Sequence, residues 1–330
     1  MPRFLPCYSE VSRRGLWTAV LTLLLWPLTM NSQPQFPTFY FFPVPNALLN
    51  TDGNTNSQLP FAVLGPVRHQ QVYDASQFGK LPPGGAFLTL IALRADFTSI
   101  RSWFATNLQV RVSTTSKGPD QLSPTFAENV GLDEIMVFSA AKWAPPATCV
   151  LSFIDGNWML LSVPFFYDPA RGNLLVEVRH AGIDWAANPA PLYQSSLDAQ
   201  SILGDPVSRA VAFSANADTA EVLDSVGLAT AFEFFPTPSL YVRSETNNVS
   251  LTWSTNPETF RLQWSDAAAS GAGWSDYSGP IEGGALWQEA VLPANSLSGR
   301  KFFRLFWNTP QPLPTPPVSP AVQVDPVIKP

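Results

Sequence analysis

Apolar and polar side chains alternate along several short segments of this 330-residue chain. Leu108, Val110 and Val112 alternate with polar neighbours, and residues 174–179 repeat the pattern. A period of two is typical of a β-strand that buries one face. Further apolar runs predict strands at 87–93, 135–139, 158–163, 209–214 and 231–235.

Clusters of Pro, Gly and Asn separate these segments. Pro169 and Gly172 lie between apolar residues 163–167 and 174–179, so we expect a turn that closes a hairpin there. Helical periodicity is nearly absent, and 97–106 and 218–226 are each expected to hold at most a turn or two of helix. Many short strands with such turns favour an all-β, antiparallel fold over a parallel α/β sheet.

A second set of strands follows the prolines at 236–238, which restrict the preceding residues to extended geometry. Its predicted strands are 249–253, 260–264, 287–292 and 300–306. We therefore expect an N-terminal linker at 33–43, a large, jelly-roll-like β-sandwich at 44–235, a proline linker at 236–238, a small immunoglobulin- or fibronectin-like β-sandwich at 239–308 and a disordered, proline-rich tail at 309–330.

The first 32 residues have the layout of a signal peptide. Arginines precede an apolar run at 16–30, and polar residues that include Ser32 follow it. Cleavage after Ser32 would export the chain to the periplasm or the extracellular space with no membrane span; retention as an anchor is the alternative. Arg13 and Arg14 also resemble the twin-arginine motif, although the leucine-rich run favours the general secretory route.

Composition excludes several classes of protein. Only 13% of the residues are charged and 33 are proline, which argues against a coiled coil or a helical bundle. A net charge of -6 and a pI near 4.9 argue against nucleic-acid binding. Removal of residues 1–32 would leave Cys149 alone, so we expect no internal disulfide and a buried thiol.

Four motifs of the second sandwich carry a resemblance to a known module. Residues 249–253, 260–265, 274–277 and 300–305 follow the order L-x-W, F-x-L-Q-x-S, W and F-F-R-L. They resemble the small module near the C-terminus of many exported bacterial proteins, which often end in a PEP-CTERM-type sorting tail. Residues 45–47, 53–54, 60–61, 68–73, 113–115, 164–169 and 172–175 are similar to uncharacterised exported β-rich proteins. The resemblance implies export and a β fold, but no activity; the chain's end lacks the apolar helix and arginine cluster of such a tail.

The residues for catalysis are few. His69 and His180 are the only histidines, and neither has the sequence context of a catalytic triad, so we interpret the chain as non-catalytic. The alternative is a secreted carbohydrate-active hydrolase, which needs only two carboxylates beside a groove. Its candidate carboxylates are Asp96, Glu128, Asp133, Glu134 and Asp155.

Two other groups of residues are candidates for ligand binding. Asn50, Asp52, Asn54 and Asn56 place oxygen-bearing side chains at alternate positions, as at the start of a calcium loop, although an ordinary turn has the same composition. The twelfth position of that loop is not acidic, so calcium is at most an optional ligand, and no cofactor is otherwise expected.

Trp274 and Tyr277 lie among Ser, Gly and Asp, where a loop would expose their rings to a ligand, whereas Trp253 and Trp264 are expected in the core. We therefore predict an exported binding, adhesion or structural protein, whose partner is an extracellular polysaccharide or a component of the cell envelope.

Overall fold

The computed structural model describes residues 39–61, 63–96, 103–144, 157–185, 196–244, 246–254, 260–268, 273–283, 287–297, 299–307, 311–313 and 318–324. These residues form antiparallel sheets and no α-helix, so the predicted all-β class is confirmed. Short 3₁₀ helices connect some strands; they are η1 (Asn46–Leu48), η2 (Ala75–Phe78), η3 (Phe126–Asn129), η4 (Pro169–Arg171) and η5 (Ala294–Ser296). None of the described helices is long and apolar enough to cross a membrane.

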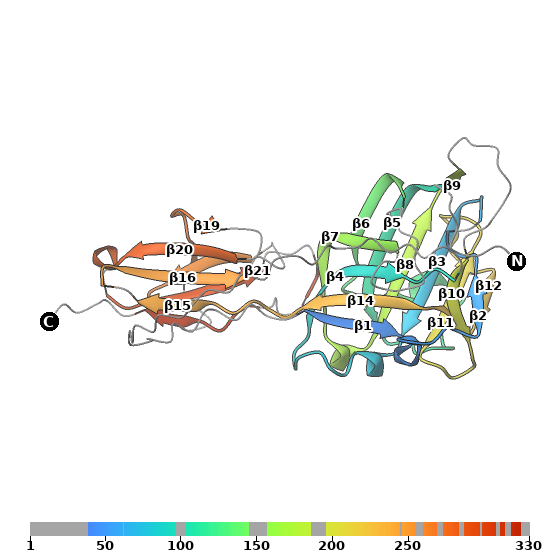
Figure 1. The fold of residues 1–330 in the computed structure, drawn as a ribbon, viewed down its shortest axis with the longest axis horizontal. Helices are drawn as coiled ribbons and strands as arrows, with labels where there is room; N and C mark the ends of the chain where they lie inside the picture. The colour runs from blue at the N-terminus through green and yellow to red at the C-terminus, as the bar shows by residue number, and fades with distance from the viewer. Residues whose placement is uncertain are drawn as a thin grey trace, which may run out of the picture. The chain divides into compact units, whose positions relative to one another are not determined.

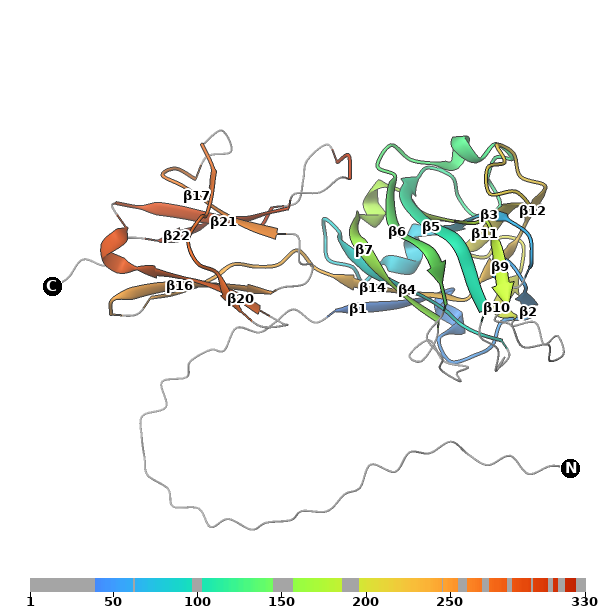
Figure 2. The ribbon, with the colours of Figure 1, turned by 90° about the horizontal axis from the view of Figure 1, so that it is seen from above.

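Two sheets face each other in the first part of the chain (Figures 1 and 2). The four-stranded sheet has the order β1 (Tyr40–Val44), β14 (Thr230–Phe235), β4 (Ala86–Leu93) and β7 (Asn157–Tyr167). The larger sheet has the order β12 (Val222–Asp224), β11 (Val207–Ala212), β3 (Val67–Tyr73), β8 (Asn173–His180), β5 (Trp103–Thr115) and β6 (Ile135–Trp143), and β9 (Gly182–Trp185) also pairs with β5. A third sheet has the order β13 (Val226–Leu228), β10 (Leu197–Ser201) and β2 (Thr55–Ser57).

Aromatic rings fill the space between the two facing sheets. Phe78 of η2 is fully buried and packs edge to face against Phe42, Tyr167, Phe232 and Phe234. Such pairs are favourable beyond the apolar area that they bury. The core therefore lies between the inner face of the four-stranded sheet and the larger sheet.

The predicted strands are found, but the predicted hairpin is wrong. β7 pairs with β4, whereas β8 pairs with β3 and β5, so the turn at Pro169–Arg171 joins two different sheets. The physical reason is that both edges of β8 are occupied by β3 and β5, which leaves no backbone edge for β7 to pair with. Of the segments expected to hold a turn of helix, 103–106 lie in β5 and 222–224 in β12, while 97–102 fall outside the described residues.

Part of the expected N-terminal linker is a strand. Tyr40–Val44 forms β1, whose five residues pair with β14 at the edge of the four-stranded sheet. Pro43 has no N–H to donate, and an edge strand tolerates this because one side of its backbone needs no partner strand. The expected signal peptide, residues 1–32, lies outside the described residues, as does Cys149.

Two four-stranded sheets form the second part of the chain. One has the order β15 (Tyr241–Ser244), β16 (Asn248–Ser254), β20 (Trp287–Pro293) and β19 (Glu282–Gly283). The other has the order β18 (Ser275–Asp276), β17 (Phe260–Ser265), β21 (Lys301–Trp307) and β22 (Val322–Val324). Trp253, Phe303 and Trp307 are buried in the core between them, and Trp264 packs half-buried against it.

The tail is partly ordered, contrary to the expectation of disorder for 309–330. Val322–Val324 pairs with β21, and the Val324 side chain is buried in the core of the second sandwich. The amide of Gln311 is also buried, and it bonds to both the N–H (2.8 Å) and the C=O (2.9 Å) of Phe166 in β7. Prolines exclude a helix here, but the alternating Val-Gln-Val segment still suits an edge strand.

Candidate ligand-binding face

Trp274 and Tyr277 lie on opposite faces of the sheet that contains β17, β18 and β21. The register pairs Asp276 with Gln263, and successive side chains in a strand point to opposite faces. Trp274 therefore shares the outward face with Asp276, whereas Tyr277 packs half-buried against the core. The backbone N–H of Tyr277 donates to the C=O of Leu262. The structure thus separates the two aromatic residues that the sequence grouped.

The ring of Trp274 stacks on a cation. The guanidinium carbon of Arg304 lies 4.2 Å from the ring centroid, and the same carbon lies 5.6 Å from the centroid of Phe306. Arg304 is opposite Gln263 in the register of β17 with β21, so both side chains leave the sheet on the outward face. We call Trp274, Arg304, Gln263, Asp276 and Arg261 the outer polar face.

Hydrogen bonds order this face. Both Nε and Nη2 of Arg304 donate to Oε1 of Gln263, at 3.0 and 2.9 Å, and Nε2 of Gln263 donates to Oδ1 of Asp276 at 2.9 Å. Nη1 of Arg261 donates to Oδ2 of Asp276 at 3.3 Å. The hydrogen bond from Gln263, followed by the contact with Arg261, lowers the pKa of Asp276, so this carboxylate stays ionised.

One polar atom of this face has no partner. The indole Nε1 of Trp274 is shielded from solvent but has no hydrogen bond among the described residues. An unsatisfied buried donor costs about 1–3 kcal/mol, so it is uncommon where packing alone has shaped a site. The position of this ring is therefore not optimal for stability.

The four residues of the predicted calcium site are exposed, and none of the described contacts brings their side chains together around a common centre. Asn54 accepts a hydrogen bond from the N–H of Ser201 at 2.8 Å and donates to its C=O at 3.2 Å. Asn56 lies in β2, while Asn50 and Asp52 precede that strand. Asn54 thus holds the start of β2 against β10, and calcium binding by these four residues stays a prediction.

Both histidines are buried on the larger sheet of the first sandwich. His69 is 2% exposed and His180 is fully buried, with its Nε2 atom 2.7 Å from the carbonyl oxygen of Pro60. Burial, and then the charge of Arg209, lowers the pKa of His69 to about 3. Neither imidazole reaches solvent, where a substrate would have to meet it.

The carboxylates of the alternative function are scattered, but two of them line one groove. Glu128 and Asp133 border a groove of about 730 Å³ together with Thr114 and Arg171. The N–H of Thr114 donates to Oδ1 of Asp133 at 2.8 Å, while Oδ2 has no partner among the described residues. Asp96 lies elsewhere, next to Ser196, and Asp155 is outside the described residues.

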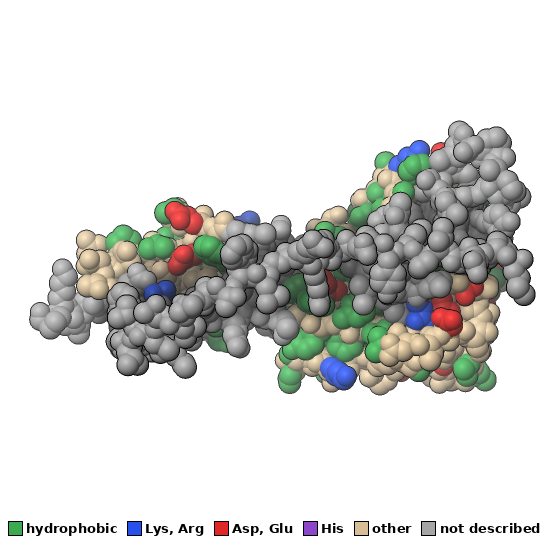
Figure 3. Space-filling view, in the orientation of Figure 1, with side chains coloured by type: hydrophobic (Ala, Val, Ile, Leu, Met, Phe, Trp, Pro, Cys, Tyr) green, Lys and Arg blue, Asp and Glu red, His purple; other side chains and the backbone are tan. Residues whose placement is uncertain are grey.

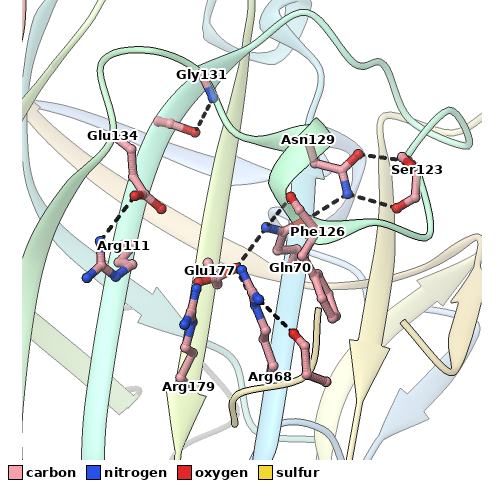
Figure 4. Close-up of polar contacts among 12 residues, drawn as sticks. Arg68, Gln70, Arg111, Ser123, Phe126, Asn129, Gly131, Glu134, Glu177 and Arg179 are labelled. Carbon is pink, nitrogen blue, oxygen red and sulfur yellow. Dashed lines mark hydrogen bonds and ion pairs between the residues drawn. The ribbon is translucent and has the colours of Figure 1, made fainter. Parts of the chain in front are cut away.

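A buried ionic network lies beside this groove (Figure 4). Oε2 of Glu177 accepts from Nε of Arg68 at 2.9 Å and from Nε2 of Gln70 at 2.8 Å, and its Oε1 accepts from Arg179. Asn129 donates to Oε1 of Gln70 at 2.9 Å, which ties the loop that contains η3 to β3. All these groups bond to one another, so we assign the network to the fold rather than to a ligand.

Arg304 and Gln263 are two residues of this face that the sequence alone did not identify. The available signal was their alternation with apolar neighbours in F-R-L-Q-W and F-F-R-L-F, which places both on an outward face. Their contact depends on the pairing of β17 with β21, which no local pattern specifies.

No protein family, curated protein or solved structure matches this chain.

Proposed function

We propose that this protein is exported and acts as a non-catalytic binding protein for a polysaccharide, outside the cell or in the cell envelope, through the outer polar face. The observation that carries the proposal is the stacked pair of Trp274 and Arg304 on the outward face of a sheet whose core lies on the other side. The Trp274 ring is partly exposed, so a ligand can contact the part of it that Arg304 leaves uncovered.

The chemistry of this face suits a sugar. A pyranose ring presents C–H groups that pack on an aromatic ring, and its hydroxyl groups both donate and accept hydrogen bonds. Trp274 supplies the ring, while Gln263, Asp276 and Arg304 supply fixed polar groups within the same set of hydrogen bonds. The rest of the binding energy would come from repeated contacts along a polymer.

Export is supported by the N-terminal arginines and the apolar run at 16–30. The scarcity of charge is compatible with a role outside the cell: on the face that Figure 3 shows, described charged side chains form only small, separate groups. Mass spectrometry of the exported protein should give an N-terminus at residue 33.

Affinity electrophoresis of residues 33–330 through gels that contain neutral or acidic polysaccharides tests the binding. We expect retardation on at least one polymer, and Trp274→Ala should weaken it about tenfold, while Trp274→Phe, which keeps a ring, should retain most of it. Tyr241→Ala removes a 39% exposed ring from the other sheet and serves as the control. No retardation on any polymer, or equal retardation of Trp274→Ala and the unaltered protein, would contradict the proposal.

A hydrolase is the second candidate, because Glu128 and Asp133 line the same groove. Incubation with the retained polysaccharide distinguishes the two functions. Release of reducing ends that both Glu128→Gln and Asp133→Asn abolish would replace the non-catalytic assignment.

A further inference from the structure

Arg304 has an unusual combination of contacts for an arginine on a sheet surface. Its guanidinium lies over the Trp274 ring, with Phe306 also near it, and one edge of its planar group bonds to the neutral amide oxygen of Gln263. The stacking and the two hydrogen bonds fix the plane of the guanidinium. The Nη1 end of the group has no acceptor among the described residues.

The other cations of this sheet are neutralised, whereas Arg304 is not. Arg261 pairs with Asp276 at 3.3 Å, and Lys301 pairs with Asp266. Arg304 has no carboxylate partner in the part of the chain that the structure describes. An arginine stays protonated in proteins, so the outer polar face holds one fixed positive charge without an anion.

Desolvation makes this charge more receptive to an anion. Partial burial against Trp274 lowers the pKa of Arg304, which reports that the charged form has lost water contacts. A guanidinium that has lost water gains more from a carboxylate than a fully hydrated one does. The free Nη1 and Nη2 hydrogens also match the spacing of two carboxylate oxygens.

The net negative charge of the whole chain is not concentrated here. Residues 239–308 contain five basic and six acidic side chains, so this sandwich is close to neutral. Repulsion of an acidic polymer by the rest of the molecule is screened beyond about 8–10 Å at physiological salt. The local charge of Arg304 can therefore decide the preference of the face.

We propose that the outer polar face selects polysaccharides that carry carboxylates, that is, polymers of uronic acids. One sugar ring packs on Trp274, and the carboxylate of that sugar or of its neighbour bonds to the Nη1 end of Arg304. This proposal rests on the proposed polysaccharide binding and adds the charge of the ligand to it.

The test compares polymers that differ only in charge. Polygalacturonate, alginate and hyaluronan are each assayed beside their carboxyl-reduced forms, with residues 33–330 and a neutral glucan and galactan as further probes. We expect at least one acidic polymer to bind about tenfold more tightly than its reduced form. Arg304→Gln should abolish this difference, and Arg304→Lys, which keeps the charge but not the planar fork, should retain only part of it.

Arg243→Gln is the matched control, since it removes an exposed arginine from β15, in the other sheet of the same sandwich; it should keep the preference. Thermal unfolding of each variant shows whether the sandwich remains folded. Equal binding of an acidic polymer and its reduced form, still lost in Trp274→Ala, would overturn the charge preference and leave polysaccharide binding intact. Binding to none of the polymers would overturn both.

Discussion

His69 shows how one buried side chain can set the response of the whole fold to acid. It lies in β3, where every residue is buried, and its Nε2 atom has no partner among the described residues. Arg209 and His180 are the charged or titratable groups that act on it, and both oppose a positive charge on the imidazole. The folded protein therefore holds His69 in the neutral form.

This arrangement predicts a loss of stability in mild acid. The pKa of His69 is about 3 in the fold against 6.5 when unfolded, so below pH 6.5 the unfolded chain takes up a proton that the folded chain does not. Stability should be unaffected by this group above pH 6.5 and should fall as the pH drops toward 3, by about 2 kcal/mol at pH 5. Urea unfolding at pH 7.5 and 5.0 measures the change.

His69→Gln, which does not titrate, is the comparison for that measurement. Its free energy of unfolding should depend less on pH across this window, although its stability at pH 7.5 falls as well. His180, whose pKa burial also lowers, should keep part of the acid sensitivity in the variant. An unchanged pH dependence in His69→Gln would contradict the assignment.

The sequence was least informative about the orientation and contacts of single side chains. Trp274 and Tyr277 share a polar sequence context, and only the register of β18 with β17 shows that one faces outward and the other inward. Arg304 is thirty residues away from Trp274 along the chain, so nothing local indicates that the two would stack.

At the scale of strands, alternation and apolar runs located most elements but not their partners. β4 is recognisable as an apolar run and β8 by the alternation of Leu174, Val176 and Val178 with their neighbours, yet the turn before β8 looks like that of a hairpin and instead connects two sheets. Pairing is decided by which strand edges are open to each strand, and that is a property of the assembled sheets.

The cross-strand network at Glu177 gives a prediction at this scale. Gln70 faces Glu177 directly in the register of β3 with β8, and Arg68 and Arg179 bond to the same carboxylate. Glu177→Gln should destabilise the fold by about 3–5 kcal/mol, because it leaves buried guanidinium charge without its anion. Chemical denaturation gives the value.

The pair formed by Glu134 and Arg111 is a control from the same sheet (Figure 4). Its side chains are 26% and 32% exposed, so Glu134→Gln should cost less than about 1 kcal/mol. Similar losses for the two substitutions would show that burial does not govern the strength of these ion pairs.

At the scale of the molecule, composition predicted the fold class and the two sets of strands. The prolines near both ends of the described chain, however, led to the wrong expectation of a linker and a disordered tail. Pro43 lies inside an edge strand, and the proline-rich segment after Trp307 contributes β22 and the buried Gln311. Proline is excluded from helix interiors and central strands. Edge strands and the segments that flank short strands still accept it, and these are the positions it occupies here.

Gln311 gives the third of these stability predictions. Gln311→Ala would leave the buried N–H and C=O of Phe166 without the amide that now bonds to both, and we expect a loss of about 2 kcal/mol. Ser275→Ala, at an exposed position of β18, should change the free energy of unfolding by no more than about 0.5 kcal/mol. Differential scanning calorimetry of both variants measures the two losses of stability. Equal losses would show that the hydrogen bonds from Gln311 to Phe166 do not stabilise the fold.

The contact between Phe87 of β4 and Trp307 of β21 bears on how the protein can be divided. Their ring centroids are 4.6 Å apart, and both residues belong to the same buried cluster although they lie on either side of the prolines at 236–238. A protease cut or a gene split at those prolines would leave two large rings exposed on the separated halves. Such halves should associate with each other or adsorb non-specifically to other surfaces. Binding measured with a separated half would then come from the newly exposed rings and not from recognition of a ligand.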